Sequence, residues 1–278
     1  MGGLLYTVNN VEINKFKKEI WNYYRVHKRV LPWRNITDPY KIFVSEMMLQ
    51  QTQVARVSKK YPVFIKTFPT FQSLAKARLS DVLKEWQGMG YNRRARFLHE
   101  TAKIIVNNYS GVLPSNVTEL KKLPGIGAGT AGSLIVFTYN IPVPFIETNI
   151  RRVILHHFFK GKNGVSDERV LEIVKKTMDK KRPREWYYAL MDYGSMLPKK
   201  ERENANTRSA MYIKQKPFRG SDREIRGNIV SFLIAHPSGT VRMIAKKYKK
   251  EEKRVQFILG ILEKEGLIKK MGQTYTIA

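Results

Sequence analysis

Two glutamates stand among apolar residues in a strongly basic chain. Glu147 ends the stretch VPFIE and is followed by Thr148 and Asn149, whereas Glu46 lies in FVSEMMLQQ. Burial raises the pKa of a carboxyl group and suits it to donate a proton, and an ionised carboxylate stabilises positive charge that develops nearby. The two acids are therefore candidates for a catalytic acid and an anionic stabiliser. The alternatives are a helix-capping acid at 147 and an exposed helix acid at 46.

A Gly-X-Gly turn in LKKLPGIGAGTAGSLIVF, residues 120–137, separates two segments of helical pattern. Backbone N–H groups at Gly125, Gly127 and the start of the next helix, at Ala128 and Thr130, can face an anion there without obstruction by side chains. A helix-hairpin-helix binds a DNA phosphate in this way. The alternative is an ordinary αα-hairpin.

The charge balance favours a polyanionic partner. The 278 residues include 51 Lys and Arg against 23 Asp and Glu, a net charge of +28. Nucleic acid is the first candidate and an anionic membrane surface the second. No apolar run approaches the roughly 18 residues that span a bilayer, and the start MGGLLYTVNN lacks the layout of a secretion signal. We expect an intracellular protein of the cytoplasm or nucleoid that does not bind membranes.

The sequence contains no cysteine, which excludes disulfides, thiolate zinc sites and cysteine-ligated iron–sulfur clusters. His156 and His157 have no metal-ligand partners at a suitable spacing, so we interpret them as structural residues. The sequence therefore predicts neither a metal nor a cofactor.

The elements that must position these residues are mostly helices. Apolar residues recur at helical spacing almost throughout, and period-2 alternation is convincing only in GLIKKMGQTYTIA, residues 266–278. Helix starts are predicted at Thr37 or Asp38, at Ser80, and at Asn116 or Thr118. The fold class is mainly α.

Changes of pattern divide the chain into a main helical domain, residues 1–200, a polar linker, residues 201–220, and a small α+β domain, residues 221–278. The small domain shows three helical patterns, the second capped by Thr240, and a terminal hairpin, which together resemble a winged helix. Its residues Lys253 and Gln256 could enter a DNA groove, or could lie on the solvated face of an amphipathic helix.

Five motifs occur in the order and spacing of the helix-hairpin-helix DNA glycosylases, over roughly residues 12 to 197. They are LPWRN…DPYKIFVSEMMLQQTQVARV, WQGMGYNRRARFLHETA, LPGIGAGTAG, FIETNIRRV and REWYYALMDYGSM. The part SEMMLQQTQV looks specifically like the MutY-type adenine glycosylases. The resemblance implies a two-lobed helix-hairpin-helix glycosylase domain, here followed by the winged-helix-like α+β domain.

The resemblance also implies roles for residues. Glu147 matches the family's catalytic aspartate, which stabilises the oxocarbenium-like sugar and positions the water. Glu46 matches the glutamate that protonates the flipped adenine. Residues of the base pocket by the same resemblance are Arg34, Gly129, Thr148 and Asn149. A surface arginine is the plain alternative for Arg34.

Gln51 and Tyr91 match residues that push into the base stack, because a target atom inside a duplex cannot be reached until its nucleotide is extruded. Each would otherwise be a core or capping residue. Tyr91 follows the turn Gly88-Met89-Gly90, so we expect it on an exposed loop tip.

The sequence departs from the family pattern at four places. Glu147-Thr148-Asn149 replaces Asp-Gly-Asn, and the extra methylene moves the carboxylate. Gly129 stands where the bifunctional relatives carry a lysine that forms a Schiff base, so we expect base removal only. No cysteine follows Pro198, where the iron–sulfur loop would begin, and the winged-helix-like region stands in place of the domain that reads 8-oxoguanine.

The sequence thus predicts a monofunctional DNA glycosylase of base excision repair. It hydrolyses the N-glycosidic bond of a flipped base, most readily adenine, in double-stranded DNA, and acts as a monomer without a cofactor. One alternative is a thymine or uracil glycosylase that acts on mismatches with guanine. Another is a DNA-binding regulator without catalytic activity.

Overall fold

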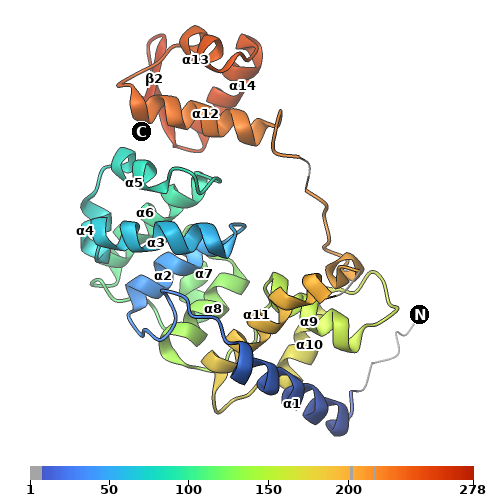
Figure 1. The fold of residues 1–278 in the computed structure, drawn as a ribbon. Helices are drawn as coiled ribbons and strands as arrows, with labels where there is room; N and C mark the ends of the chain where they lie inside the picture. Colours follow the sequence, from blue (N-terminus) through green and yellow to red (C-terminus); the bar gives the residue numbers. More distant parts are fainter. Residues whose placement is uncertain (1–7, 201–202, 216) are drawn as a thin grey trace. The chain divides into compact units, whose positions relative to one another are not determined.

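The computed structural model describes residues 8–200, 203–215 and 217–278 (Figure 1). The chain divides into two compact units. Unit 1 comprises Met1–Thr37, Ser115–Thr118 and Ile126–Lys214, and unit 2 comprises Asp38–Pro114, Glu119–Gly125 and Gln215–Ala278. Each unit is therefore assembled from segments that are distant in the sequence. The expected fold class is confirmed, since the chain is mainly helical and ends in a small two-stranded sheet.

Unit 1 is helical and contains both the first helix of the chain and the helix that follows the hairpin. Its elements are α1 (Asn10–His27), α8 (Ala128–Tyr139), α9 (Thr148–Phe158), α10 (Asp167–Thr177), α11 (Pro183–Lys200) and the 3₁₀ turn η1 (Ala205–Arg208). A capping box starts α1, because Asn9 Oδ1 accepts from Glu12 N–H and Glu12 Oε2 accepts from Asn9 N–H. Phe16 of α1 is buried edge-on against Trp186 of α11.

The first part of unit 2 is a cluster of short helices. They are α2 (Pro39–Leu49), α3 (Val54–Thr67), α4 (Phe71–Lys76), α5 (Leu79–Trp86) and α6 (Arg93–Asn108). Asp38 caps α2, as expected, by accepting from the N–H groups of Tyr40 and Lys41. The predicted start at Ser80 is wrong. Helix α5 begins one residue earlier, after Arg78, which makes no side-chain cap.

Helix α7 (Val117–Lys121) begins in unit 1 and ends in unit 2. Asn116 Oδ1 accepts from Thr118 N–H at 2.7 Å, so the start predicted at Asn116 is confirmed. The Gly-X-Gly turn then leads into α8, which begins directly after Gly127.

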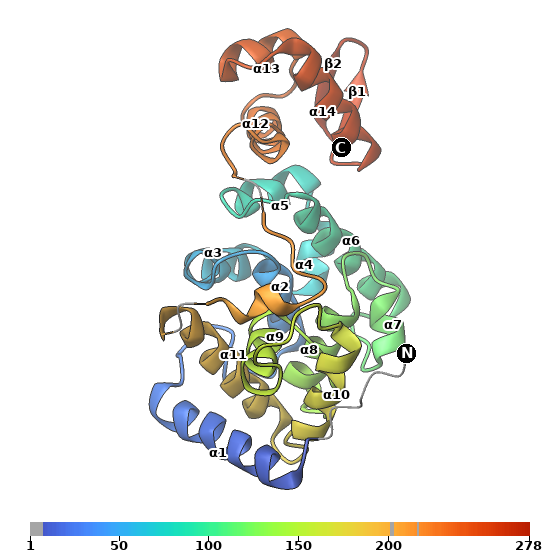
Figure 2. The ribbon, with the colours of Figure 1, turned by 90° about the vertical axis from the view of Figure 1, so that its right-hand side faces the viewer.

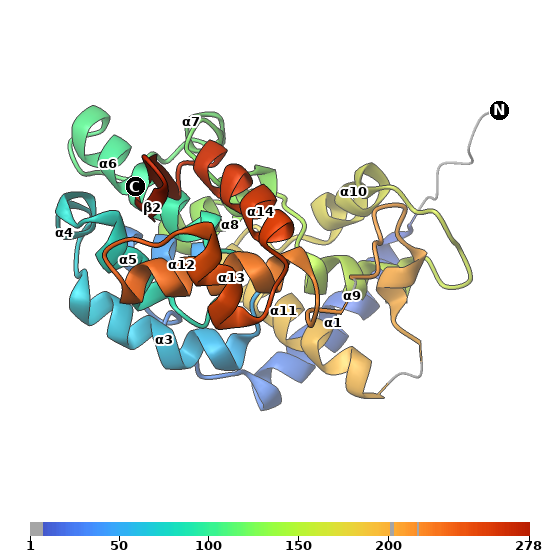
Figure 3. The ribbon, with the colours of Figure 1, turned by 90° about the horizontal axis from the view of Figure 1, so that it is seen from above.

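The C-terminal region of unit 2 has the element order of a winged helix (Figures 1 and 3). It contains α12 (Asp222–Ala235), α13 (Val241–Tyr248), α14 (Glu252–Lys264), β1 (Ile268–Met271) and β2 (Thr274–Ile277). Thr240 caps α13 as predicted. The strands pair antiparallel from Ile268 opposite Ile277, and a bridge between Gly239 and Tyr275 adds a short third strand position. The predicted terminal hairpin is confirmed.

Part of the predicted linker, residues 201–220, packs on unit 1. Its residues 201, 202 and 216 lie outside the described ones, but Ala205 and Asn206 of η1 are buried, and η1 packs on α9. Figure 2 shows η1 beside α9. The bounds of the three sequence regions stay a prediction.

None of the helices within the described ranges is long and apolar enough to cross a membrane.

Candidate active site

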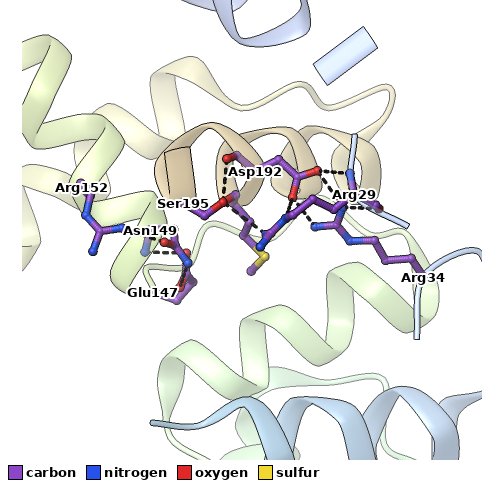
Figure 4. Close-up of polar contacts among 8 residues, drawn as sticks. Arg29, Arg34, Glu147, Asn149, Arg152, Asp192 and Ser195 are labelled. Carbon is purple, nitrogen blue, oxygen red and sulfur yellow. Dashed lines mark hydrogen bonds and ion pairs between the residues drawn. The ribbon is translucent and has the colours of Figure 1, made fainter. Parts of the chain in front are cut away.

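Glu147 lies at the N-terminus of α9 and folds back onto it (Figure 4). Its Oε1 accepts from the backbone N–H groups of Asn149 and Ile150, both at 2.8 Å, and its Oε2 accepts from Asn149 Nδ2 at 3.2 Å. A carboxylate offers about four lone-pair positions. These three bonds from described residues therefore leave one position, on Oε2, for a further donor.

The carboxylate is held in a setting that disfavours its charge. Burial raises the pKa of Glu147 above its ordinary value, although the backbone N–H groups of Asn149 and Ile150, the charge of Arg152 and the Asn149 amide all act to lower it. The residue as a whole is half-buried. A carboxyl group that is fixed in position and whose charge is opposed by burial is a typical reactive group.

Arg152 orients the amide of Asn149. Its Nη1 donates to Asn149 Oδ1 at 2.9 Å and to the carbonyl of Gly194 at 2.8 Å, so the Asn149 NH₂ group is turned toward Glu147. At Gly194 a Cβ would lie 2.5 Å from the Asn149 carbonyl, so only glycine lets α11 come this close. Arg152 is not among the site residues expected from the sequence, because nothing distinguishes one arginine among 51 Lys and Arg residues before the fold is known.

The segment after α11 supports the backbone beside Glu147. The side chain of Thr148 is exposed, but its carbonyl accepts from Asn206 Nδ2 at 3.2 Å. Further along α9, Arg208 Nη1 donates to the carbonyl of Leu155 at 3.4 Å. A polar turn thus lies where the resemblance places a cluster loop, and it contacts both ends of the helix that follows Glu147.

Gly129 faces the segment that leads to Glu147. A Cβ at this position would lie 2.9 Å from the carbonyl oxygen of Ile146, a distance that side chains essentially never adopt. The absence of a side chain at 129 therefore permits the close approach of α8 to this segment, and any side chain there requires the backbone to shift.

Arg34 is buried rather than on the surface, so the surface alternative is wrong. Its Nη1 and Nη2 donate to the two oxygens of Asp192 at 2.8 and 2.7 Å, and its guanidinium lies 4.5 Å from the Tyr188 ring centre. The Arg29 side chain donates to the same carboxylate at 2.6 Å (Figure 4). A contact of Arg34 with a base stays a prediction.

His156 and His157 lie in an aromatic environment, which agrees with the structural interpretation. The His157 ring packs edge-on against Phe16, 5.0 Å between centres, and beside Tyr193. Burial lowers the pKa of His157 to about 4, which keeps the ring neutral at pH 7.

In unit 2, Glu46 lies near the end of α2, directly before the buried residues Met47 and Met48, and is itself half-buried. This placement agrees with the expected polar residue on an apolar helix, and argues against the exposed-acid alternative.

Arg94 joins the end of α2 to the turn before α6. Its guanidinium is buried and donates to the carbonyls of Met47 and Met48 at 3.0 and 2.9 Å, to Thr52 Oγ1 at 2.8 Å, and to the carbonyls of Met89 and Gly90 at 3.3 and 3.2 Å. Burial lowers its pKa to about 10, so it remains charged at pH 7. The last carbonyls of a helix have no partner within the helix. Arg94 satisfies two of them and thereby fixes the two residues that directly follow Glu46.

The two expected wedge residues share an unusual backbone. Gln51 and Tyr91 have φ angles of 51° and 47°, in the left-handed region that side chains other than glycine rarely adopt. Both side chains are exposed, and both line one pocket of unit 2. Strained, exposed residues of this kind concentrate at binding sites.

The hairpin turn is tightly packed on one side and open on the other. A Cβ at Gly125, whose φ is +76°, would lie 2.9 Å from Phe97, and the Gly125 carbonyl accepts from Gln50 Nε2 at 3.1 Å. Gly127 and Ala128 are exposed, Thr130 is half-buried, and no side chain caps the start of α8. The N–H groups at this start are thus placed as an anion site requires.

In the C-terminal region, Lys253 and Gln256 are exposed on α14, and beside them Phe257 is 64% exposed. The exposed face agrees equally with a DNA contact and with a solvated amphipathic helix.

Residues 44–180 match the family described as HhH-GPD superfamily base excision DNA repair protein. Over these residues, about half of the chain, the sequence has the pattern of this superfamily. Among curated members it is 36% identical to the adenine DNA glycosylase of Buchnera aphidicola subsp. Baizongia pistaciae, over 69% of this chain and 55% of that protein. It is 40% identical to the adenine DNA glycosylase of Mycolicibacterium smegmatis, over 56% of this chain and 54% of that protein. The chain thus spans about half the length of these relatives.

Solved structures agree with the HhH-GPD fold. A thermostable thymine-DNA glycosylase superposes with a TM-score of 0.62 at 26% identity, over 67% of this chain and 88% of that one. A trapped endonuclease III–DNA covalent intermediate superposes with a TM-score of 0.57 at 19% identity, over 66% and 85%, and supports the fold alone.

The iron–sulfur cluster that the resemblance implies does not fit this HhH-GPD chain. The sequence has no cysteine, and the described residues contain no cluster of three or more His, Asp or Glu that could hold a metal ion. Thiolates are the ligands that such clusters require. The η1 segment contacts α9 through hydrogen bonds instead.

Proposed function

We propose that this HhH-GPD protein is a monofunctional DNA glycosylase that removes adenine from mispaired duplex DNA. The observation that carries the proposal is the setting of Glu147: a half-buried residue whose carboxylate is fixed by three hydrogen bonds from described residues and keeps one acceptor position on Oε2. The cleavage of an N-glycosidic bond builds positive charge on the sugar, and an anion fixed in advance stabilises that charge without reorganisation.

The reaction requires an acid as well as an anion. In the proposed mechanism Glu46 donates a proton to N7 of the flipped adenine, so that the base leaves as a neutral molecule. Glu147 stabilises the sugar cation, and the free lone pair of Oε2 accepts a proton from the water that attacks C1′. Asn149, held by Arg152, keeps the carboxylate in place.

The HhH-GPD relatives named as adenine glycosylases support adenine as the base. The similarity to a thymine-DNA glycosylase supports a second candidate, thymine or uracil opposite guanine. Glu46 favours adenine, because thymine and uracil have no N7 and leave more readily when negative charge on their oxygens is stabilised, for which a carboxylate has the wrong sign.

The absence of a lysine at 129 supports hydrolysis without strand cleavage. A Schiff base needs an amine beside the sugar. We propose that the enzyme works without a cofactor, and that the hairpin and the basic surface hold double-stranded DNA.

A single-turnover panel tests the proposal. Duplexes that carry adenine, uracil, thymine, hypoxanthine or 8-oxoguanine in defined mispairs are incubated with the protein and analysed with and without alkali. We expect adenine to be released, and strands to break only after alkali. Glu147→Gln and Glu46→Gln should each lose most of this rate while DNA affinity is kept, and Glu172→Gln, which removes an exposed acid of α10, should match wild type.

Activity on a mispaired pyrimidine that is unaffected by Glu46→Gln would replace adenine with the second candidate. Wild-type rates in Glu147→Gln would remove the catalytic assignment of that residue.

A further inference from the structure

The pocket of about 800 Å³ in unit 2 is lined from two sides. One side is the turn at residues 87–92 with the wedge residues Gln51 and Tyr91. The other is formed by Gln215, Phe218 and residues of α12, with Leu262 of α14. Pockets of 300–1,000 Å³ are the usual size for small ligands. Nothing in the proposed mechanism uses the second side.

Arg223 connects the two sides. Its Nη1 donates to the Tyr91 hydroxyl at 3.1 Å and to Gln215 Oε1 at 3.3 Å. Arg226, further along α12, also lines the pocket and forms an ion pair with Glu265. The α12 region therefore reaches the strained wedge residue directly, through a charged side chain.

The chemistry of the lining is that of a nucleotide site. Arg56 and Arg223 supply positive charge for a phosphate, and Arg226 adds a charge that Glu265 partly offsets. None of the described lining residues is an Asp or Glu. Tyr91 and Phe218 supply aromatic faces, and Phe218 is 61% exposed. Bases stack on exposed aromatic rings, and side-chain amides read base edges.

The amides come from both sides of the pocket. Gln51, Gln53 and Gln87 belong to the first side and Gln215 to the second. A side-chain amide offers both a donor and an acceptor, which is the pattern that a base edge also presents.

We propose that this pocket binds one unpaired nucleotide of a DNA strand, with the base against Tyr91 and Phe218 and the phosphate near the arginines. The proposal rests on the proposed binding of DNA, and it gives the C-terminal region a role in holding a nucleotide other than the one that is cleaved. Arg223 and Phe218 are the residues whose substitution tests the proposal, because both line the second side of the pocket.

A comparison of two DNA duplexes isolates the pocket. In the first, a stable abasic analogue lies opposite a guanine, so one base is unpaired. In the second, two abasic analogues lie opposite each other, so no base is available. Guanine is neither the adenine of the proposed activity nor a pyrimidine of the second candidate, so the measurement does not depend on catalysis and its outcome is separate from that of the glycosylase assay. The ratio of the two Kd values, measured by fluorescence anisotropy, reports the contribution of the unpaired base.

We expect wild type to prefer the first duplex about tenfold, the effect of one stacked base. Arg223→Ala and Phe218→Ala should bring the ratio close to one. Arg219→Ala is the matched control, because it removes a charge from the same exposed segment without touching the pocket, and should keep the ratio. Loss of general electrostatic attraction lowers affinity for both duplexes and leaves the ratio unchanged.

Single-stranded DNA and free dAMP are added as competitors. Competition by the single strand at concentrations near its own Kd supports the proposal. A ratio near one in wild type, equal ratios in all variants, or competition by free dAMP with the same sensitivity to Arg223→Ala would overturn it, the last because the occupant would then be a free nucleotide.

Discussion

The ionised form of Glu147 lowers the free energy of unfolding, because the carboxylate is buried. Burial raises its native pKa above the ordinary 4.5, so the native protein binds this proton more tightly than the unfolded chain. The resulting stabilisation is present below pH 4.5 and is lost as the pH rises through the native pKa. We predict that Glu147→Gln, whose amide oxygen still accepts from the Asn149 and Ile150 N–H groups, melts at a higher temperature than wild type at pH 7. Melting curves by circular dichroism from pH 4 to 8 should show the difference shrinking toward acid, and a lower melting temperature at pH 7 would contradict this account.

Arg152 lowers the pKa of Glu147 by its charge and by its hold on Asn149. If the ionised carboxylate is the active form, the rate should fall on the acid side as Glu147 takes up a proton. Arg152→Met should therefore shift the acid limb of the single-turnover rate to higher pH. The control is Arg151→Met, since Arg151 pairs with Asp167 and does not act on Glu147. An unshifted limb in Arg152→Met would exclude this electrostatic role.

Gly129→Lys should not create a strand-cleaving enzyme. The new Cβ meets the Ile146 carbonyl at 2.9 Å and must displace the segment that ends at Glu147. A displacement near 1 Å at a reacting group costs about a hundredfold in rate. We expect a slower release of base and no covalent complex on borohydride treatment, with Gly129→Ala equally slow because it carries the same Cβ. A trapped protein–DNA complex would show that the backbone adapts.

Among the elements, α2 depends on Arg94 for its C-terminal end. Arg94→Lys keeps the charge but cannot make the forked bonds to five acceptors, and leaves buried carbonyls without a donor. We predict a loss of about 3 kcal/mol in the free energy of unfolding, measured by urea denaturation.

Arg93→Lys serves as the control for Arg94, because the Arg93 side chain is 55% exposed and lies 3.8 Å from Glu265. Its effect should stay within about 0.5 kcal/mol. Equal effects of the two changes would mean that the buried bonds of Arg94 add little.

The elements also show what could be predicted from the sequence. The helix caps Asp38, Asn116 and Thr240 could be predicted, because each accepts a hydrogen bond from a backbone N–H group only two or three residues later. Such a contact depends only on the local sequence. The η1 turn could not be predicted. It contacts α9 through hydrogen bonds from Asn206 and Arg208 to backbone carbonyls, and such contacts produce no regular spacing of apolar residues in the sequence. The buried positions of Arg34 and Arg94 could not be predicted for a related reason. The sequence alone does not distinguish an arginine that binds protein groups from one that binds DNA.

At the scale of the whole molecule, the net charge of +28 predicts a steep dependence of DNA binding on salt. Each phosphate that a basic side chain neutralises releases a counterion. For undamaged duplex we expect affinity to fall by about a thousandfold or more between 50 and 200 mM salt, the loss typical of six to ten phosphate contacts. The measurement is a titration of labelled duplex at four salt concentrations. A flat response would argue against nucleic acid as the partner.

The ion pair between Arg34 and Asp192 has a consequence for synthesis on the ribosome. Its partners are 158 residues apart in the sequence. Phe16 of α1 is likewise buried only after Trp186 and the rest of α11 have been synthesised. At about 5–20 residues per second, the first helix spends roughly 10 to 30 s outside the exit tunnel before its partner is made. During that interval the segments of unit 2 that lie between are already available to fold. The apolar face of α1 is therefore the part of the nascent chain with the greatest need of a chaperone.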